Sequence, residues 1–96
     1  MEKDIERKLA DKIKMMGGLC LKFVSPGCAG VPDRIVLMPG GHIWFVELKD
    51  HALPRELQKY WLDLLGRMGF PALVVDSDDA AEQFLHRIAR EVGDEV

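Results

Sequence analysis

The sequence predicts an α/β fold in which helices flank a mixed β-sheet. Three observations lead to this prediction. Apolar residues recur with helical period near both ends of the chain and once in between, three short strand-like runs follow the first helical segment, and a fourth run separates the last two helical segments. The predicted order is α-β-β-β-α-β-α. With 96 residues, the chain has room for one domain, residues 1–96, around a single hydrophobic core.

The first half of the chain is predicted to begin with a helix over residues 2–16. Its apolar residues fall on one stripe, formed by Ile5, Leu9, Ile13 and Met16. Two glycines directly after this stripe end the helix. A mostly apolar strand is predicted at 19–24. The segment that follows, 25–32, contains two prolines and two glycines, so we expect a loop there.

The second half opens with two predicted strands, 33–38 and 42–49. A proline and two glycines at 39–41 join them, which is a strong hairpin signal. A helix follows over 54–68, because its apolar residues share one face, formed by Leu57, Tyr60, Trp61, Leu64, Leu65 and Met68. Proline at the first helical position agrees with this start. A short buried strand is predicted at 71–75.

The last predicted helix begins where Ser77 or Asp78 can cap it. Its inward face is predicted to consist of Ala81, Phe84, Leu85, Ile88 and Val92. No internal repeat or linker interrupts the sequence, which agrees with a single domain.

Composition limits the function. The formal net charge of −3 argues against a simple nucleic-acid binder, which normally carries an excess of Lys and Arg. It argues less against a metal-dependent nuclease, since bound cations offset the carboxylates that such a site concentrates. Cys20 and Cys28 lack a metal-ligand spacing, and the sequence predicts neither a signal peptide nor a membrane-spanning segment. We therefore expect a cytoplasmic protein with no membrane partner.

The candidate site depends on the register of the hairpin around 39–41. A three-residue loop places Asp33 opposite Glu47, with both side chains on one face of the sheet and Cα atoms roughly 4.5–5.5 Å apart. Lys49 is two residues beyond Glu47 and projects from the same face. A slip of one residue would instead place Glu47 opposite Arg34 and separate the two carboxylates.

Two carboxylates and a lysine at one end of a hairpin suit phosphodiester hydrolysis. Mg²⁺ prefers one or two carboxylates, completed by water and by phosphate oxygens of the substrate. The lysine can orient the attacking water or neutralise charge that develops at the phosphorus centre. The alternative interpretation of the same residues is a cross-strand salt bridge at the edge of the sheet.

Asp33 after a proline, followed on the next strand by Glu47 and Lys49, resembles the signature of the PD-(D/E)xK nucleases. More narrowly, the chain resembles the virus-type replication-repair nuclease family, the VRR-NUC domain, from about residue 2 to residue 88. The matching stretches are Ile5-Glu6, Gly17-Gly18, Lys22-Phe23, Ser25-Pro26-Gly27, Gly30-Val31-Pro32-Asp33-Arg34-Ile35, Phe45-Val46-Glu47-Leu48-Lys49, Gln58 and Gly69.

This resemblance implies a restriction-endonuclease-like core and hydrolysis of phosphodiesters that depends on Mg²⁺ or Mn²⁺. It implies that Asp33 and Glu47 bind the metal together with the backbone carbonyl of Leu48. Lys49 is then the catalytic lysine.

The resemblance adds two helical residues to the site. The family's helix-one glutamate matches Glu6, which lies at the border of the buried stripe and can point toward the sheet. Glu2, one turn earlier, is the rival candidate. The family's glutamine matches Gln58, whose amide can hold a water on the metal or the amine of Lys49. From periodicity alone, a solvated glutamate and an ordinary border glutamine are the alternatives.

The substrate implied by the resemblance is DNA. Lys22 and Arg34 are candidates for contacting its phosphates. Stand-alone family members, many of them from phages, are similar to dimeric resolvases of four-way (Holliday) junctions, so we expect a homodimeric endonuclease that acts on branched DNA in a bacterial or phage-infected cell. A two-fold symmetric substrate calls for paired active sites. The alternative is a non-catalytic DNA-binding or assembly module that keeps the nuclease fold.

Overall fold

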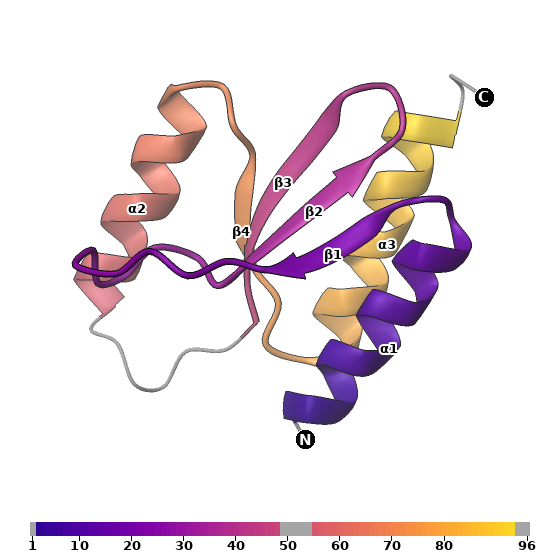
Figure 1. The fold of residues 1–96 in the computed structure, drawn as a ribbon, viewed down its shortest axis with the longest axis horizontal. Helices are drawn as coiled ribbons and strands as arrows, with labels where there is room; N and C mark the ends of the chain where they lie inside the picture. Colours follow the sequence, from indigo (N-terminus) through magenta and orange to yellow (C-terminus); the bar gives the residue numbers. More distant parts are fainter. Residues whose placement is uncertain (1, 49–54, 94–96) are drawn as a thin grey trace.

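The computed structural model describes residues 2–48 and 55–93. The helices and strands follow the predicted order α-β-β-β-α-β-α (Figure 1). Their bounds are α1 Glu2–Met15, β1 Leu19–Lys22, β2 Arg34–Met38, β3 His42–Glu47, α2 Arg55–Arg67, β4 Ala72–Val74 and α3 Asp78–Val92. Strand β1 is shorter than the predicted 19–24. Of the two caps considered for α3, Ser77 is the one used, since its side chain accepts a hydrogen bond from the Ala80 amide.

The four strands form one sheet in the order β1-β2-β3-β4. Strands β1 and β2 pair antiparallel, as do β2 and β3, whereas β3 and β4 run parallel. The predicted mixed sheet is therefore confirmed. Parallel neighbours need a crossover connection, and α2 lies in the segment that provides it.

Helices α1 and α3 pack against each other on one side of the strands, and α2 lies on the other side, beside β4 (Figure 1). Alternation along β2 and β3 sends every second side chain toward α1 and α3. The core on this side consists of Leu9, Ile13, Val36, Met38, Trp44, Val46, Leu48, Val75, Ala81, Phe84, Ile88 and Val92. All of the predicted inward residues of α3 are in this core except Leu85, which is partly buried against it.

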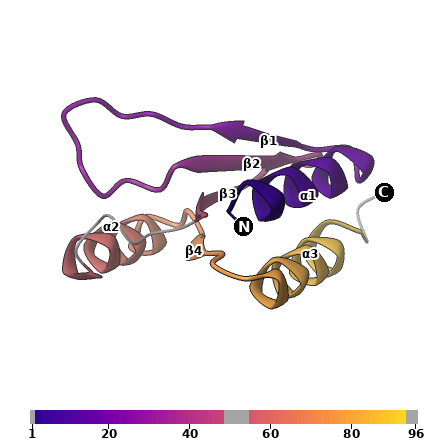
Figure 2. The same cartoon turned by 90° about the horizontal axis from the view of Figure 1, so that it is seen from below.

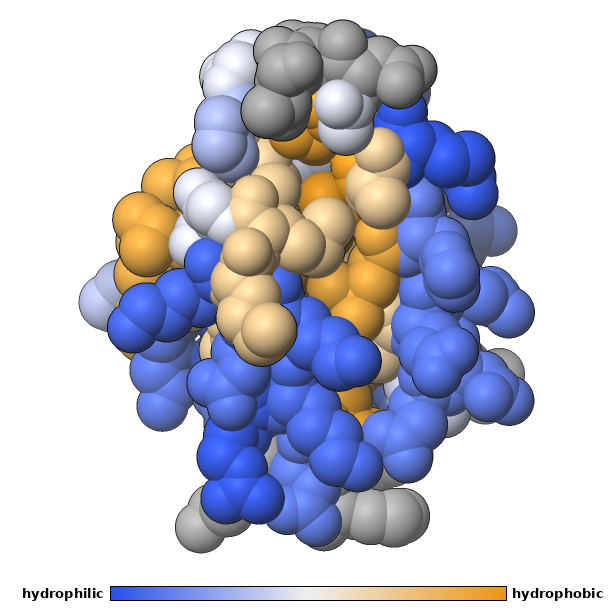
Figure 3. Space-filling view, turned by 90° about the vertical axis from the view of Figure 1, so that its right-hand side faces the viewer, coloured by the Kyte–Doolittle hydropathy of each residue, from blue (hydrophilic) through white to orange (hydrophobic). Residues whose placement is uncertain are grey.

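The surface formed by α1 and α3 carries an apolar strip between hydrophilic borders (Figure 3). A groove of about 410 Å³ lies here, and its apolar lining consists of Ile5, Leu9, Ala81 and Leu85. Lys8, Lys12 and Glu82 are among its polar lining residues. Within the described residues, no helix is both long enough and apolar enough to cross a membrane.

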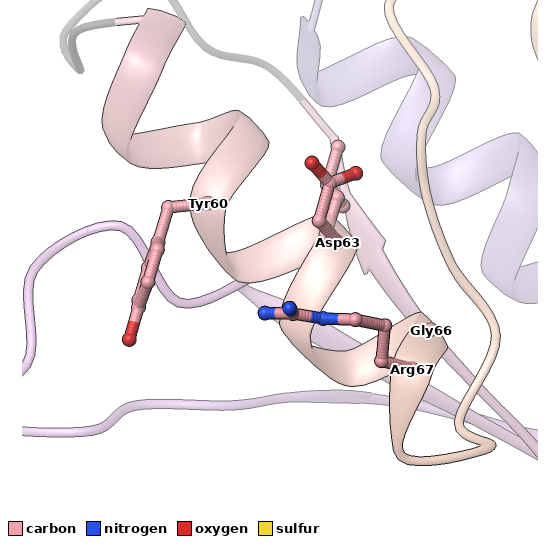
Figure 4. A pocket seen from close by; sticks show the side chains of 5 residues that line it. Tyr60, Asp63, Gly66 and Arg67 are labelled. Atoms are coloured by element: carbon pink, nitrogen blue, oxygen red, sulfur yellow. The ribbon is translucent and has the colours of Figure 1, made fainter.

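The apolar face predicted for residues 54–68 is wrong at two positions. Tyr60 is 54% exposed and Met68 is 62% exposed, so neither belongs to the buried face. Tyr60 instead lines a surface pocket with Asp63 and Arg67 (Figure 4). Helix α2 packs against β4, and its Leu57 and Trp61 lie against Gly30 in the loop before β2, so its buried face is narrower than the predicted stripe.

Candidate functional site

The hairpin has the predicted register. Met38 pairs with His42 and Arg34 pairs with Val46. One further step along the two chains places Asp33, just before β2, opposite Glu47 at the end of β3. The alternative register, with Glu47 opposite Arg34, is wrong.

Asp33 is held at this position by hydrogen bonds to both neighbouring strands. Its Oδ1 accepts a hydrogen bond from the backbone amide of Leu48 at 3.0 Å. Its carbonyl oxygen accepts one from the amide of Phe23 at 2.8 Å. The carboxylate is thereby tied to the end of β3, and the main chain to the segment that follows β1.

Glu47 and Asp33 differ in their exposure to solvent. Glu47 is buried, with 5% of its surface exposed, whereas the side chain of Asp33 is 39% exposed. Alternation along β3 turns Val46 toward α1 and α3, so Glu47 lies on the opposite face with Phe45. A buried carboxylate beside a partly exposed one fits a site that is open to a ligand on one side only.

The loop before Asp33 is fastened to α2. Figure 2 shows it extending beyond the strands toward this helix. Gly30 has a positive φ of 93° and is buried; a Cβ atom there would lie 2.6 Å from Leu57 Cγ and 2.9 Å from Trp61 Cδ1. The indole Nε1 of Trp61 donates a hydrogen bond to the Ala29 carbonyl at 3.0 Å. Helical spacing predicts Trp61 on the apolar face of this helix, and the glycine in the loop is the sequence signal for this closer contact.

Gln58 lies on α2, one turn before Trp61. Its Nε2 atom is buried and has no hydrogen-bond partner in the part of the chain that the structure describes. A buried amide without a partner costs free energy, so such a group calls for an explanation. A buried donor on the helix that packs against the loop before Asp33 agrees with a role toward a bound ligand.

Glu6 and Arg34 form an ion pair that the sequence did not predict. The Arg34 guanidinium contacts the Glu6 carboxylate of α1 through Nη2, and its Nη1 donates a hydrogen bond to the Asp33 carbonyl at 2.9 Å. The side chain of Arg34 is only 9% exposed. This environment favours an internal role for Arg34 over the predicted contact with phosphates. Glu6 does reach the sheet, as expected from its border position, but it meets Arg34 there.

Other predicted site residues remain predictions. Lys49 lies outside the described residues, and so does the side chain of Glu2. Lys22 is exposed at the end of β1, where it pairs with Arg34 in the strand register. Leu48 is buried, and its amide is the group that holds Asp33.

The pKa of the Cys20 thiol is raised, and Asp33 is one of the causes. Burial and, as the smaller cause, the negative charge of Asp33 together raise the pKa of this thiol from 9.0 to about 11. Cys20 is on β1, partly buried against the core. The Asp33 carboxylate therefore disfavours the thiolate form of Cys20.

The donor set fits a hard divalent cation. Within residues 2–48 and 55–93, no group of three or more His, Cys, Asp and Glu side chains forms a metal-binding cluster. Mg²⁺ does not require one, because it retains several waters and takes one or two carboxylates plus phosphate oxygens. Asp33 and Glu47 supply two carboxylates and no nitrogen or sulfur ligand, which suits Mg²⁺ or Mn²⁺ rather than Zn²⁺.

Comparison with known proteins agrees with this geometry, although no family model matches the sequence. A solved structure described as a VRR_NUC domain matches with a TM-score of 0.78 and 28% identity, over 88% of this chain and 94% of that chain. The fold is therefore that of the restriction-endonuclease-like nucleases. A protein of Acyrthosiphon pisum secondary endosymbiont phage 1, named "Putative nuclease p44", is 41% identical over 81 residues, which cover 81% of this chain and 85% of the phage protein. The chain belongs to the VRR-NUC family.

Proposed function

We propose that this VRR-NUC domain is a metal-dependent endonuclease that hydrolyses DNA phosphodiesters at the end of the β2–β3 hairpin. The observation that carries the proposal is the placement of Asp33 opposite Glu47, with the Asp33 carboxylate held by the Leu48 amide at 3.0 Å. Salt bridges of little consequence are typically exposed, whereas Glu47 is buried and lies opposite Asp33 in the hairpin register.

In the proposed mechanism, Asp33 and Glu47 hold Mg²⁺ or Mn²⁺, assisted by the backbone carbonyl of Leu48. When bound, the metal supplies Lewis acidity that polarises the phosphodiester and activates water. Burial of Glu47 strengthens its electrostatic interaction with a cation, since less water screens the charges. Lys49 is assigned to neutralise negative charge on the phosphate oxygens as the bond to the leaving oxygen breaks.

Gln58 and Lys22 are assigned to the substrate side of the site. The Nε2 of Gln58, which has no hydrogen-bond partner within residues 2–48 and 55–93, can donate a hydrogen bond to a water or a phosphate oxygen. Lys22 is exposed at the end of β1, next to the strand that follows Asp33, and its ammonium suits a DNA phosphate.

Branched DNA and a homodimer complete the proposal. Each chain contributes one Asp33–Glu47 pair, whereas cutting a four-way junction at two symmetric positions takes two active sites. The match to a phage protein suits a nuclease that acts on replication or recombination intermediates in the cytoplasm of a bacterial or phage-infected cell.

The experiment is incubation of the purified protein with a labelled four-way junction and a matching linear duplex, in Mg²⁺, in Mn²⁺ and in EDTA. We expect paired symmetric cuts in the junction, none in EDTA and few in the duplex. Equal cutting of both DNAs would retain the nuclease and reject the junction preference. Tight binding of DNA without cutting in either metal would favour the non-catalytic module.

A further inference from the structure

Arg34 carries a positive charge into the interior of the protein next to a site residue. Its side chain is 9% exposed, and Arg34 is the first residue of β2, on the face that α1 covers. Among the described side chains, the Glu6 carboxylate is in direct contact with it, and Oδ2 of Asp33 lies 3.9 Å from Nη1. A buried guanidinium needs negative charge close by, because taking it out of water is costly.

The two carboxylates have different tasks. Glu6 comes from the helix, on the side of the sheet away from Glu47, and its side chain is 37% exposed. Asp33 already uses Oδ1 to accept the Leu48 amide. If Arg34 also took Oδ2, that oxygen would be less available to a cation, since an arginine and a metal compete for the same lone pairs and repel each other.

We propose that Glu6 is a positioning residue that holds the Arg34 guanidinium and thereby keeps it from capturing the carboxylate of Asp33. The main chain at Asp33 does not depend on Arg34 alone, because its carbonyl accepts hydrogen bonds both from Arg34 at 2.9 Å and from the Phe23 amide at 2.8 Å. This proposal rests on the proposed function, because it assumes that Asp33 binds a divalent cation. It differs from the role implied by family resemblance, in which Glu6 belongs to the active site itself.

The proposal makes a prediction that a ligand role for Glu6 does not make. In Glu6→Gln, the guanidinium loses the negative charge of Glu6 and turns to the carboxylate of Asp33, so binding of the cation weakens. In the double variant Glu6→Gln/Arg34→Gln, the competing charge is gone, and binding recovers although Glu6 is still missing. If Glu6 were itself a ligand, the second substitution would not restore binding.

The measurement is Mn²⁺ binding by isothermal titration calorimetry without DNA, on the wild type, Glu6→Gln, Arg34→Gln and the double variant. We expect Glu6→Gln to weaken binding by about 10–100-fold, the range for residues that orient metal ligands. We expect Arg34→Gln and the double variant to remain within about 3-fold of wild type. A double variant as weak as Glu6→Gln, or a Glu6→Gln variant that binds like wild type, would overturn the proposal.

A matched control lies on α3, where Arg87 and Glu91 form a 2.9 Å ion pair with partly exposed side chains. Glu91→Gln and Arg87→Gln/Glu91→Gln change charge as the test variants do, and both are expected to leave Mn²⁺ affinity unchanged. Circular dichroism checks the fold of each variant. Should Glu6→Gln not fold, Arg34→Gln alone decides, because a loss of more than about 10-fold there contradicts the idea that Arg34 competes with the metal.

Failure of the proposed function gives a different result. Asp33→Asn keeps an oxygen that can accept the Leu48 amide but loses the charge. If the wild type does not bind Mn²⁺, or if Asp33→Asn binds it equally well, the metal site itself is wrong and the inference falls with it. If Asp33→Asn abolishes binding but the double variant does not recover, only the positioning role is wrong.

Discussion

The carboxylate of Asp33 accepts a hydrogen bond from the backbone amide of Leu48, the residue that follows Glu47, at 3.0 Å. Because of this bond, the distance between the two candidate metal ligands is fixed by the hairpin register and does not depend on the loop before β2 alone. Leu48 is buried, so its amide depends on the protein for a hydrogen-bond acceptor. Asp33 therefore contributes both to the proposed chemistry and to the stability of the hairpin.

Removal of that acceptor is expected to destabilise the fold. Asp33→Ala leaves the buried Leu48 amide without a partner, which costs roughly 1–3 kcal/mol in the free energy of unfolding. Asp33→Asn retains an acceptor and is expected to cost less. Urea unfolding measures both. Asp4→Ala, at an exposed carboxylate on α1, is the control and is expected to change little. Equal stability of Asp33→Ala and wild type would show that the bond does not stabilise the hairpin.

The contact of Gly30 with α2 gives a second prediction. In Gly30→Ala, a Cβ atom would meet Leu57 and Trp61 at a residue with positive φ. Backbone strain and overpacking together are expected to lower the free energy of unfolding by roughly 2–5 kcal/mol. Gly27→Ala has a similar positive φ but no atom within 4 Å of the new Cβ, so it measures the strain alone, about 1–2 kcal/mol. Thermal and urea unfolding compare the two. A Gly27→Ala variant as unstable as Gly30→Ala would mean that the contact with α2 is unimportant.

Gln58 should show a trade-off between stability and activity. Gln58→Met replaces an amide, whose buried Nε2 has no hydrogen-bond partner among the described residues, by an apolar group of similar length, and we expect the free energy of unfolding to rise by about 1 kcal/mol. Cleavage of DNA in Mg²⁺ should fall by roughly 10–100-fold, as for other residues next to a metal site. Gln83→Met on the exposed side of α3 is the control for the substitution. Cleavage at the wild-type rate would remove Gln58 from the site.

The raised pKa of Cys20 predicts selective thiol chemistry. With a pKa of about 11, Cys20 stays protonated at pH 8, so a short pulse of iodoacetamide should modify the exposed Cys28 first. Asp33→Asn removes one cause of the shift, so it should lower the pKa of Cys20 and speed its alkylation, as read by mass spectrometry. An unchanged alkylation rate would place Asp33 too far from the thiol to affect it.

The same shift links stability to alkaline pH. The folded protein holds the Cys20 proton up to a pKa of about 11, whereas the thiol in the unfolded chain loses it near 9.0. The stability that this group contributes is therefore fully present below pH 9 and is lost as the pH rises to about 11. Urea unfolding across this range, compared with Cys20→Ala, isolates the effect. A pH dependence identical in the two proteins would contradict it.

Much of the fold could be predicted from the sequence, because local patterns determine it. Helical periodicity located α1, α2 and α3, and the proline and two glycines at 39–41 set the hairpin register from Met38 opposite His42. Since side chains alternate along strands, that register also placed Asp33 opposite Glu47. The prediction was wrong where burial depends on how much of a helix the neighbouring elements cover, as for Tyr60 on α2, which is exposed.

The ion pair between Glu6 and Arg34 was missed for a physical reason. A charged residue is normally expected at the surface, so Arg34 was considered a contact for phosphates. The alternation of side chains along β2 does indicate that Arg34 is buried, because it lies on the same face as Val36 and Met38, which are both buried. The partner of a buried charge comes from another element, and periodicity alone does not reveal which residue of α1 provides it.

The central claim is that Asp33 and Glu47 together form a metal-dependent hydrolytic site, and its most direct test is the single-turnover cleavage rate of a labelled four-way junction in Mg²⁺ by wild type and by Asp33→Asn. The substitution keeps the hydrogen-bond acceptor for Leu48 while it removes the charge that would hold the cation. We predict a fall of roughly 10²–10³-fold or more, as is typical when an electrostatic contribution to the transition state is lost, with the fold intact by circular dichroism. Cleavage within a few-fold of wild type by a folded Asp33→Asn protein would contradict the site.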